Sequence, residues 1–203
     1  TIFHGDAREI VPALDRQGFD LVITDPPFFM PANVSNTRRA WKRTLGDAAI
    51  LAGYFKDSFA EIAEKLKPTG AFYTFSDAVS YAIFTVVLYP LFDRTQCIVW
   101  DKVAPGLGNG WRHSNELIIH GAFKETVYAP GMRRDVLPAK TIPSADRLHQ
   151  SEKAEGVLNP LLSAHPRGRV LDPYMGSGAV LNAAKKLGRE AVGIDIDEAN
   201  CEE

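Results

Sequence analysis

The chain has 203 residues, of which 45% are hydrophobic and 24% charged, and its formal net charge is −2 at pH 7. These values predict one globular domain, residues 1–203, with a sizeable core. They exclude a broadly basic nucleic-acid-binding surface, so any contact with phosphates has to be local. The chain has no run of about 18 apolar residues, so we expect no membrane span. The two cysteines, Cys97 and Cys201, lack the spacing of a metal site and indicate a reducing, cytoplasmic compartment.

Apolar segments alternate along the chain between the patterns of strands and helices. Strands are predicted at 1–5, 20–24, 70–75, 96–101, 116–121, 168–172 and 190–195. Helices are predicted at 7–14, 50–66, 77–89, 155–163 and 178–187. We expect Pro68-Thr69-Gly70 to end the helix 50–66, whose aromatic stripe reads as core. This alternation indicates an α/β fold with a mostly parallel sheet and helices on both faces.

The tetrapeptide Asp25-Pro26-Pro27-Phe28 follows the buried strand 20–24. Two prolines stop the ladder and fix an extended turn, so a carboxylate and an aromatic ring stand at the carboxyl end of a strand, where α/β sheets bind ligands. The Asp25 carboxylate and the Pro26 carbonyl could hold both hydrogens of an exocyclic amino group while Phe28 stacks on a base. This set predicts methylation of a nucleobase amine. The alternative is a plain strand-to-loop turn.

A basic segment follows this tetrapeptide in the chain. Its cations are Arg38, Arg39, Lys42 and Arg43. A loop here could close over a flipped base while the cations neutralise phosphates. The alternative is an ordinary solvated charged surface.

The strands 96–101 and 116–121 predict a hairpin. Its connection carries Trp111, Arg112, His113 and Asn115, which could face DNA. The alternative is a hairpin loop with a packed tryptophan. The segment 122–148 that follows is proline-rich and offers little material for reading a long DNA site.

A glycine turn follows the strand 168–172 and opens the helix 178–187. Gly176 and Gly178 allow the backbone to approach a ligand closely, and the helix amino terminus would face a nucleotide-like cofactor. The next strand ends at Asp195, an acid at the distance that suits the ribose hydroxyls of such a cofactor. Asp197 more plausibly caps the short helix that follows.

Taken together, the motifs at 25–28 and 172–178 resemble those of the amino-group DNA methyltransferases that use S-adenosylmethionine. Two further segments support the resemblance: 149–154 is similar to the family's His-Pro-Thr-Glu-Lys-Pro segment, and 98–102 with 110–116 resembles its hairpin region. Gln150 and Ala154 replace two of the family's prolines. The resemblance implies a Rossmann-like methyltransferase fold with a mixed, mostly parallel sheet. It also implies a circularly permuted motif order.

The resemblance also implies three sets of site residues. The catalytic set is Asp25, Pro26, Pro27 and Phe28. The cofactor-binding set is Asp6, Ser151, Lys153, Asp172, Pro173, Tyr174, Met175, Gly176, Ser177, Gly178 and Asp195. The DNA-binding set is Arg38, Arg39, Lys42, Arg43, Trp111, Arg112 and Asn115. Asp6 would accept from the cofactor adenine, although its position fits an N-cap of the helix 7–14 equally well.

These residues predict direct methyl transfer from S-adenosylmethionine to the N6 amine of adenine in double-stranded DNA. Cytosine-N4 methylation is the runner-up because both targets are exocyclic amines, and the family's N4 members more often carry serine in place of Asp25. A non-catalytic nucleic-acid-binding paralogue would have lost Asp25, Phe28 or the glycines. The short segment 122–148 implies a short recognition sequence, an added partner subunit or a homodimer.

Overall fold

The computed structural model describes residues 1–27, 45–106, 109–143 and 152–202. Within these residues the strands are β1 (Ile2–His4), β2 (Phe19–Thr24), β3 (Leu66–Ser76), β4 (Arg94–Asp101), β5 (Asn115–Ala122), β6 (Val136–Pro138), β7 (Val170–Asp172) and β8 (Ala191–Asp195). They form one 8-stranded sheet in the order β1-β8-β7-β2-β3-β5-β4-β6. Only β5 runs antiparallel to its neighbours, β3 and β4, among these described strands. The predicted mixed, mostly parallel sheet is therefore confirmed.

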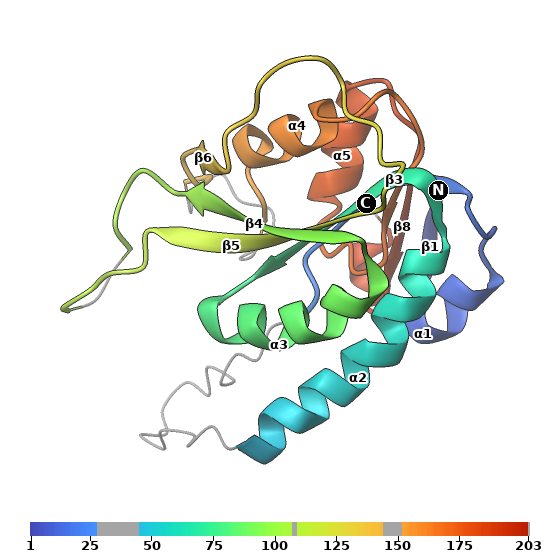
Figure 1. The fold of residues 1–203 in the computed structure, drawn as a ribbon, viewed down its shortest axis with the longest axis horizontal. Helices are drawn as coiled ribbons and strands as arrows, with labels where there is room; N and C mark the ends of the chain where they lie inside the picture. The colour runs from blue at the N-terminus through green and yellow to red at the C-terminus, as the bar shows by residue number, and fades with distance from the viewer. Residues whose placement is uncertain (28–44, 107–108, 144–151, 203) are drawn as a thin grey trace.

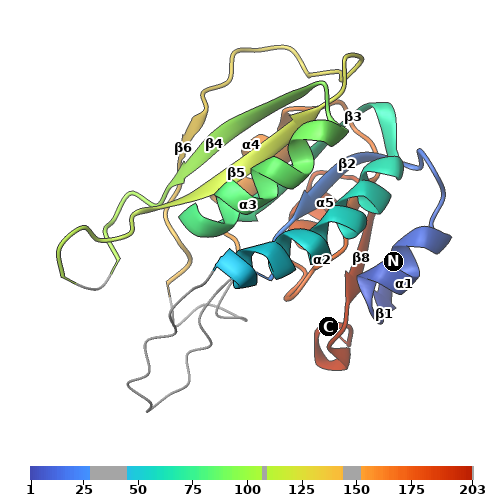
Figure 2. The ribbon, with the colours of Figure 1, turned by 60° about the horizontal axis from the view of Figure 1, so that its bottom comes forward.

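Helices cover both faces of this sheet (Figure 1). The α-helices are α1 (Ala7–Ile10), α2 (Leu45–Glu64), α3 (Ala78–Leu88), α4 (Glu155–Ser163) and α5 (Ala179–Lys186). Short 3₁₀ turns are η1 (Val11–Ala13), η2 (Tyr89–Leu91) and η3 (Glu198–Asn200). Figure 2 shows α2 and α3 side by side against one face, while α4 and α5 pack on the other. None of the helices in the described ranges is long and apolar enough to span a membrane.

The central strand β2 is buried on both faces because helices cover both. Val22 contributes to the core on the side of α1, α2 and α3, whereas Leu21 and Ile23 contribute to the core under α4 and α5. This explains why β2 reads as a continuous apolar run and not as an alternating one. Because β2 is buried up to its last residue, Thr24, the chain leaves the sheet at Asp25.

The aromatic stripe of α2 lies in the core, as expected. Phe55 and Phe59 are fully buried, and their ring centroids lie 4.8 and 5.3 Å from that of Phe84 on α3. Burying a side chain of this size stabilises the fold by about 1.5–3 kcal/mol. The stripe thus anchors α2 to the sheet and leaves no role for these rings in stacking on a base.

Predictions at two prolines were wrong, and α2 also begins at Leu45, five residues before the predicted start. The expected helix 7–14 is split into α1 and η1, because Pro12 has no N–H with which to continue the α-helical ladder. The motif at 68–70 does not end a helix: α2 ends at Glu64 and β3 already begins at Leu66. Pro68 is tolerated there because the register of β3 against β2 shifts between Leu66 and Ala71, so no ladder bond is lost.

Strand β6 lies within the segment 122–148, where no strand was predicted. It pairs in parallel with the end of β4, with Val99 opposite Val136 and Asp101 opposite Pro138. Its three residues are too few to give a periodic signal, and Pro138 is acceptable because β6 is the edge strand of the sheet.

The first and last strands of the chain are neighbours at the other edge. His4 of β1 lies opposite Asp195 of β8, and the two strands are parallel. Both chain ends therefore contribute to one end of the sheet. The permuted order of the motifs relative to other methyltransferases stays a prediction.

Candidate active site

The pairing of the strands brings the motifs together. Strand β2 pairs with β7, with Val22 opposite Leu171, and β7 pairs with β8, with Asp172 opposite Gly193. Because these strands are parallel, residues 25–27 after β2 and the glycine turn after β7 emerge side by side at the carboxyl edge of the sheet. Asp195 at the end of β8 lies at the same edge. Residues nearly a whole chain apart thus form one site.

Asp25 stands at the start of the loop after β2, with a fifth of its side chain exposed. Its Oδ2 atom lies 2.5 Å from Nζ of Lys153. Its Oδ1 atom is buried and has no hydrogen-bond partner in the described part of the chain. Pro26 beside it is buried, whereas Pro27 is exposed. One carboxylate oxygen is thus held by the protein and the other is left to accept.

Three further charges surround this carboxylate. Lys153 Nζ lies 3.2 Å from Glu116 Oε2, and Glu116 Oε1 accepts a 2.6 Å hydrogen bond from Lys102. Burial raises the pKa of Asp25, while the Lys153 ammonium acts in the opposite direction. Burial also lowers the pKa of Lys153, but its two carboxylate neighbours outweigh this and raise it. Lys153 is therefore a protonated ammonium at neutral pH.

Sequence reasoning assigned no role to Glu116 or Lys102. Both occur in the segments that resemble the family's hairpin region, but nothing local shows that they face Lys153, 37 residues beyond Glu116. The available signal was their position in the hairpin: Lys102 follows β4 and Glu116 lies near the start of β5, so the two stand at its base. The role of Lys153 as a cofactor ligand stays a prediction.

Asp172 joins the two motifs inside the fold. Its Oδ1 atom accepts a 2.8 Å hydrogen bond from the Thr24 hydroxyl of β2 and a 3.2 Å bond from the Tyr174 backbone N–H. Burial raises the pKa of Asp172 to about 7. The bond from Thr24 couples the residue just before Asp25 to the start of the glycine turn, so Asp172 fixes the relative position of both motifs.

The glycine turn has the geometry of a ligand cradle. Gly176 and Gly178 have φ angles of 49° and 71°, in the left-handed region that favours glycine. A Cβ atom built on either residue meets no atom within 4 Å, so the backbone there faces open space. Helix α5 begins directly after the turn, and Ser177 lies half-buried between the two glycines. The turn can therefore take a ligand against its backbone and the helix amino terminus.

Asp195 supports this turn directly. Its Oδ2 atom accepts a 2.8 Å hydrogen bond from the Gly176 N–H, and its Oδ1 atom accepts from the N–H of Asp197 and the Asn200 amide. A carboxylate has about four acceptor positions, so Asp195 keeps capacity for a further donor. Asp197 caps η3 through the N–H of Ala199, as predicted.

Three residues of the motif 172–178 direct their side chains into the protein. The Tyr174 hydroxyl lies 2.7 Å from the Ser58 hydroxyl of α2. Pro173 and Met175 are buried, and Met175 packs so closely over Gly193 that a Cβ there would lie 2.4 Å from its sulfur. These side chains hold the turn on the sheet, and only their backbone faces the cradle.

Asp6 caps helix α1 through a 2.8 Å hydrogen bond from the Arg8 N–H. Its carboxylate also forms an ion pair with the Arg8 side chain at 2.5 Å, and this hydrogen bonding lowers its pKa. The N-cap reading is thus confirmed. Contact of Asp6 with a cofactor adenine stays a prediction.

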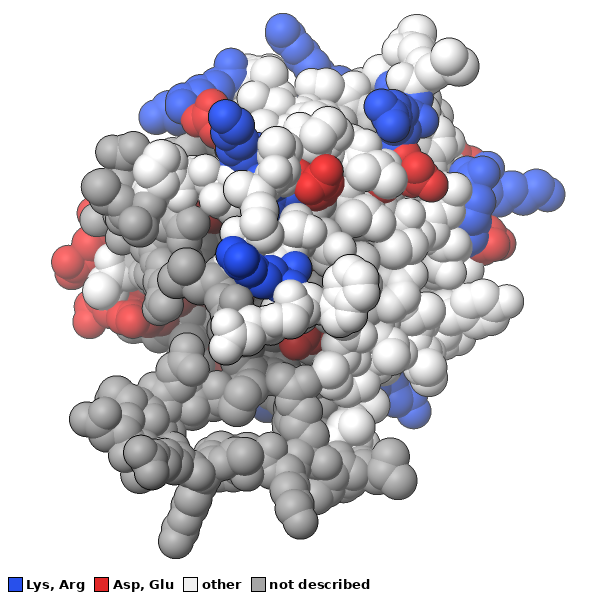
Figure 3. All heavy atoms as spheres, turned by 90° about the vertical axis from the view of Figure 1, so that its left-hand side faces the viewer, with Lys and Arg blue, Asp and Glu red and all other residues white. Residues whose placement is uncertain are grey.

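The hairpin between β4 and β5 projects from the sheet (Figure 1). Trp111 and Arg112 in this hairpin and Asn115 at its base are exposed, so the alternative of a packed tryptophan is wrong. In Figure 3, which views this end of the molecule, Lys and Arg side chains are scattered among Asp and Glu side chains and do not gather into one basic patch on the described residues in view. The predictions for Phe28, Arg38, Arg39, Lys42, Arg43 and Ser151 lie outside the described residues.

Comparison with known proteins is consistent with this geometry. A family model described as DNA methylase, covering N6 and N4 enzymes, matches residues 134–203. Putative methylase YubD of Escherichia coli K12 is 28% identical over 96% of this chain and 83% of its own length. DNA adenine methyltransferase YhdJ of the same organism is 22% identical over 97% of this chain and 78% of its own length.

Solved structures share the fold. The complex of M1.HpyAVI with SAM superimposes with a TM-score of 0.72 at 21% identity, covering 100% of this chain and 95% of that one. The cytosine-N4-specific PvuII DNA methyltransferase gives a TM-score of 0.77 at 13% identity, covering 97% and 82%. The Rossmann-like methyltransferase fold expected from the sequence is therefore confirmed.

Proposed function

We propose that this DNA methyltransferase transfers a methyl group from S-adenosylmethionine to the exocyclic N6 of adenine in DNA. The observation that carries the proposal is the buried Oδ1 atom of Asp25, which has no partner among the described residues. A buried acceptor is costly to leave unsatisfied. The amino group of a flipped base would satisfy it at the carboxyl edge of the sheet, where α/β folds bind their substrates.

The residues act mainly by positioning. Asp25 Oδ1 and the Pro26 carbonyl each accept one amino hydrogen, which draws the nitrogen toward tetrahedral geometry and directs its lone pair outward. Phe28 stacks on the base, a contact worth about 1–3 kcal/mol. The nitrogen becomes acidic only as the new bond to carbon forms, so Asp25 takes the proton late and need not be a strong base beforehand. No covalent enzyme intermediate is required.

S-adenosylmethionine supplies the electrophilic methyl group when bound. The backbone of the turn at Gly176 and Gly178 and the amino terminus of α5 would hold it, with Asp195 toward the ribose and Asp6 toward the adenine. The open space above both glycines fits such a cofactor. The solved complex of M1.HpyAVI with SAM, which has the same fold, supports the choice.

Double-stranded DNA is the proposed substrate, and the target base has to leave the stack at a cost of a few kcal/mol. Trp111, Arg112 and Asn115 on the hairpin are exposed and available for this contact. The basic segment with Arg38, Arg39, Lys42 and Arg43 would neutralise phosphates. The short segment 122–148 would be supplemented by a partner subunit or a second copy. YubD and YhdJ are bacterial, and we place this chain likewise in the cytoplasm of a bacterium or of a phage-infected cell.

Cytosine-N4 methylation is the second candidate, favoured by the likeness in fold to the cytosine-N4-specific PvuII DNA methyltransferase. Asp25 favours adenine because the family's N4 members more often carry serine at this position. The test is mass analysis of nucleosides from DNA incubated with the protein and cofactor labelled in its methyl group. Labelled N6-methyladenine is the expected product. Labelled N4-methylcytosine would replace the proposal with its alternative, and the absence of any labelled base would refute both.

A further inference from the structure

We propose that Lys153 is a positioning residue for Asp25, holding one carboxylate oxygen so that the other faces the substrate amine, and that Glu116 and Lys102 hold Lys153 in place. The inference rests on the proposed function for its catalytic meaning. It assigns Lys153 to the catalytic half of the site, although the family resemblance placed it among the cofactor ligands.

The contacts divide the two oxygens of Asp25 between protein and substrate. Lys153 Nζ lies 2.5 Å from Oδ2, whereas Oδ1 is buried without a partner in the part of the chain that is described. A carboxylate held by one oxygen can no longer rotate freely about its last torsion. Its second oxygen therefore stands in a fixed direction, which is what in-line transfer to a poor nucleophile requires.

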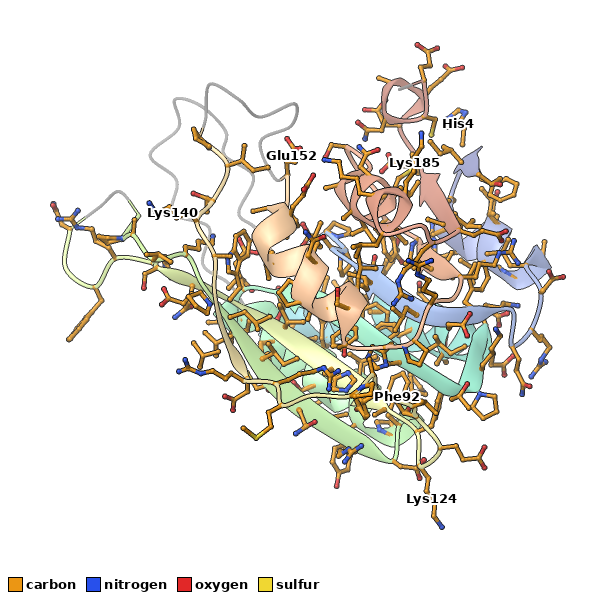
Figure 4. All side chains as sticks on the ribbon, turned by 90° about the horizontal axis from the view of Figure 1, so that it is seen from above. His4, Phe92, Lys124, Lys140, Glu152 and Lys185 are labelled. Carbon is orange, nitrogen blue, oxygen red and sulfur yellow. The ribbon has the colours of Figure 1, made fainter. Side chains whose placement is uncertain are left out.

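Lys153 is itself fixed from three sides. Its side chain is only 7% exposed, its Nζ atom lies 3.2 Å from Glu116 Oε2, and it lies 5.1 Å from the centre of the Phe75 ring. The segment that carries it leads directly into helix α4, which packs beside α5 above the sheet, as the positions of Glu152 and Lys185 show in Figure 4. The ammonium is thus anchored independently of any cofactor.

The four charges alternate in sign and sum to zero. Lys102, Glu116, Lys153 and Asp25 follow one another in contact, and the exposed fractions of their side chains are 23%, 19%, 7% and 20%. Lys153 balances the charge of Asp25 and Lys102 balances that of Glu116, while Glu116 also faces Lys153. Without Glu116, the lysine would pair with Asp25 alone, so the glutamate limits how strongly Lys153 suppresses the basicity of the catalytic carboxylate.

The charges that face Asp25 come from several elements. Lys153 precedes α4, Lys102 follows β4, Glu116 lies on β5, and Asp172 ends β7. An opposite charge at such distances lowers the pKa of an acid by about 1–3 units. Removing the Lys153 ammonium therefore leaves burial and the Glu116 carboxylate, which favour the protonated form of Asp25, opposed only by the smaller effect of Lys102 among the described residues.

The experiment compares Lys153→Met with the wild type in three measurements. The pKa of Asp25 is followed by carbon NMR of protein labelled in its aspartate carboxyl groups, with Asp25→Asn used to assign the signal. We expect it to rise by about 1–3 units. The acid limb of the kcat profile should move up by the same amount. The Kd for S-adenosylmethionine, measured by calorimetry, should stay within about threefold of wild type.

Three variants make the result interpretable. Lys186→Met is the matched control, because it also removes a lysine paired with a carboxylate, that of Glu155, but at an exposed position. Lys153→Arg keeps the charge and should leave the pKa of Asp25 close to wild type. If Lys153→Met fails to fold, the double variant Lys153→Met with Glu116→Gln takes its place in all three measurements. This double variant leaves the net charge of the cluster unchanged.

Two results would overturn the inference. An unchanged pKa of Asp25 in the methionine variant would show that Lys153 does not act on it. A large loss of cofactor affinity without that change would return Lys153 to the cofactor ligands. The NMR titration needs no substrate, so it distinguishes this failure from that of the proposed function, which would appear as wild-type protein that methylates no base.

Discussion

The two buried histidines His120 and His165 are expected to destabilise the folded protein on mild acidification. His120 Nδ1 faces the Phe72 carbonyl at 3.2 Å, and His165 Nδ1 faces the Val127 carbonyl at 2.8 Å. A carbonyl can only accept, so each Nδ1 carries the hydrogen. Each Nε2 then accepts from a tyrosine hydroxyl at 2.7 Å, Tyr128 for His120 and Tyr73 for His165. A second proton would displace the tyrosine as donor.

Burial lowers the pKa of both His120 and His165 to about 4, from an ordinary value of 6.5. Arg94 and His165 near His120, and Arg133 and Arg189 near His165, add to this effect. The folded pKa is the lower one, so the unfolded chain binds more protons between pH 6.5 and pH 4. The contribution of the two histidines to stability is therefore complete above pH 6.5 and falls as the pH drops through this window.

The magnitude follows from the two pKa values. Linkage gives a loss of about 2 kcal/mol per histidine between pH 7 and pH 5, or about 4 kcal/mol for the pair. A domain of this kind has only about 5–15 kcal/mol of stability. Asp172, whose pKa is raised to about 7, acts in the opposite direction over this range. The loss is therefore measured as the difference in pH dependence of urea unfolding, between pH 7 and pH 5, of the wild type and of a variant with both His120→Gln and His165→Gln. His4→Gln, at an exposed position, is the matched control for removal of an imidazole. Equal pH dependence in wild type and double variant would refute the reasoning.

Three further predictions concern the site. Asp25→Ala should abolish turnover while the calorimetric affinity for S-adenosylmethionine falls only modestly, and retained methylation would contradict the catalytic assignment. Asp195→Ala should weaken cofactor binding by about tenfold or more, since it removes a charged acceptor and the bond to Gly176. Asp197→Ala, which removes only the cap of η3, should have much less effect on that binding. A larger loss of affinity in Asp197→Ala than in Asp195→Ala would assign the ribose contact to Asp197. Replacing Arg38, Arg39, Lys42 and Arg43 with Gln should flatten the log–log salt dependence of DNA binding by about two to three units. An unchanged slope would leave DNA contact to the hairpin around Trp111.

The sequence was most informative where the signal is local. The apolar run of β2 followed by two prolines located Asp25 at a strand end, and the glycine turn before α5 located the cradle. Both rest on short-range chemistry: proline cannot donate to a ladder, and glycine alone adopts positive φ without strain. The α4 boundaries, Glu155–Ser163, were also predicted correctly from pattern alone.

What the sequence could not supply was contact across the fold. The ion pair between Asp25 and Lys153 joins residues 128 positions apart, and it depends on β2, β5 and the segment before α4 meeting at one edge. The bond from Thr24 to Asp172 spans 148 positions. Such pairs arise from strand order, which short-range periodicity does not encode. The expectation that Pro68-Thr69-Gly70 ends a helix also failed, because the shift in register between β2 and β3 allows a proline within the strand.

The charge cluster at Asp25 is better understood as a device of the site than as a source of stability. Desolvating two lysines and two acids costs several kcal/mol per ion, and packed apolar residues in their place are often as stable or more so. Phe75 and Trp100, whose rings lie beneath Lys153 and Lys102, show that apolar side chains pack well in this region. The charges bring something that such packing cannot: a carboxyl group oriented inside the protein by an ion pair. Because Lys102 and Glu116 also pair the two ends of the hairpin, a change in the position of the hairpin would alter the surroundings of the Asp25 carboxylate.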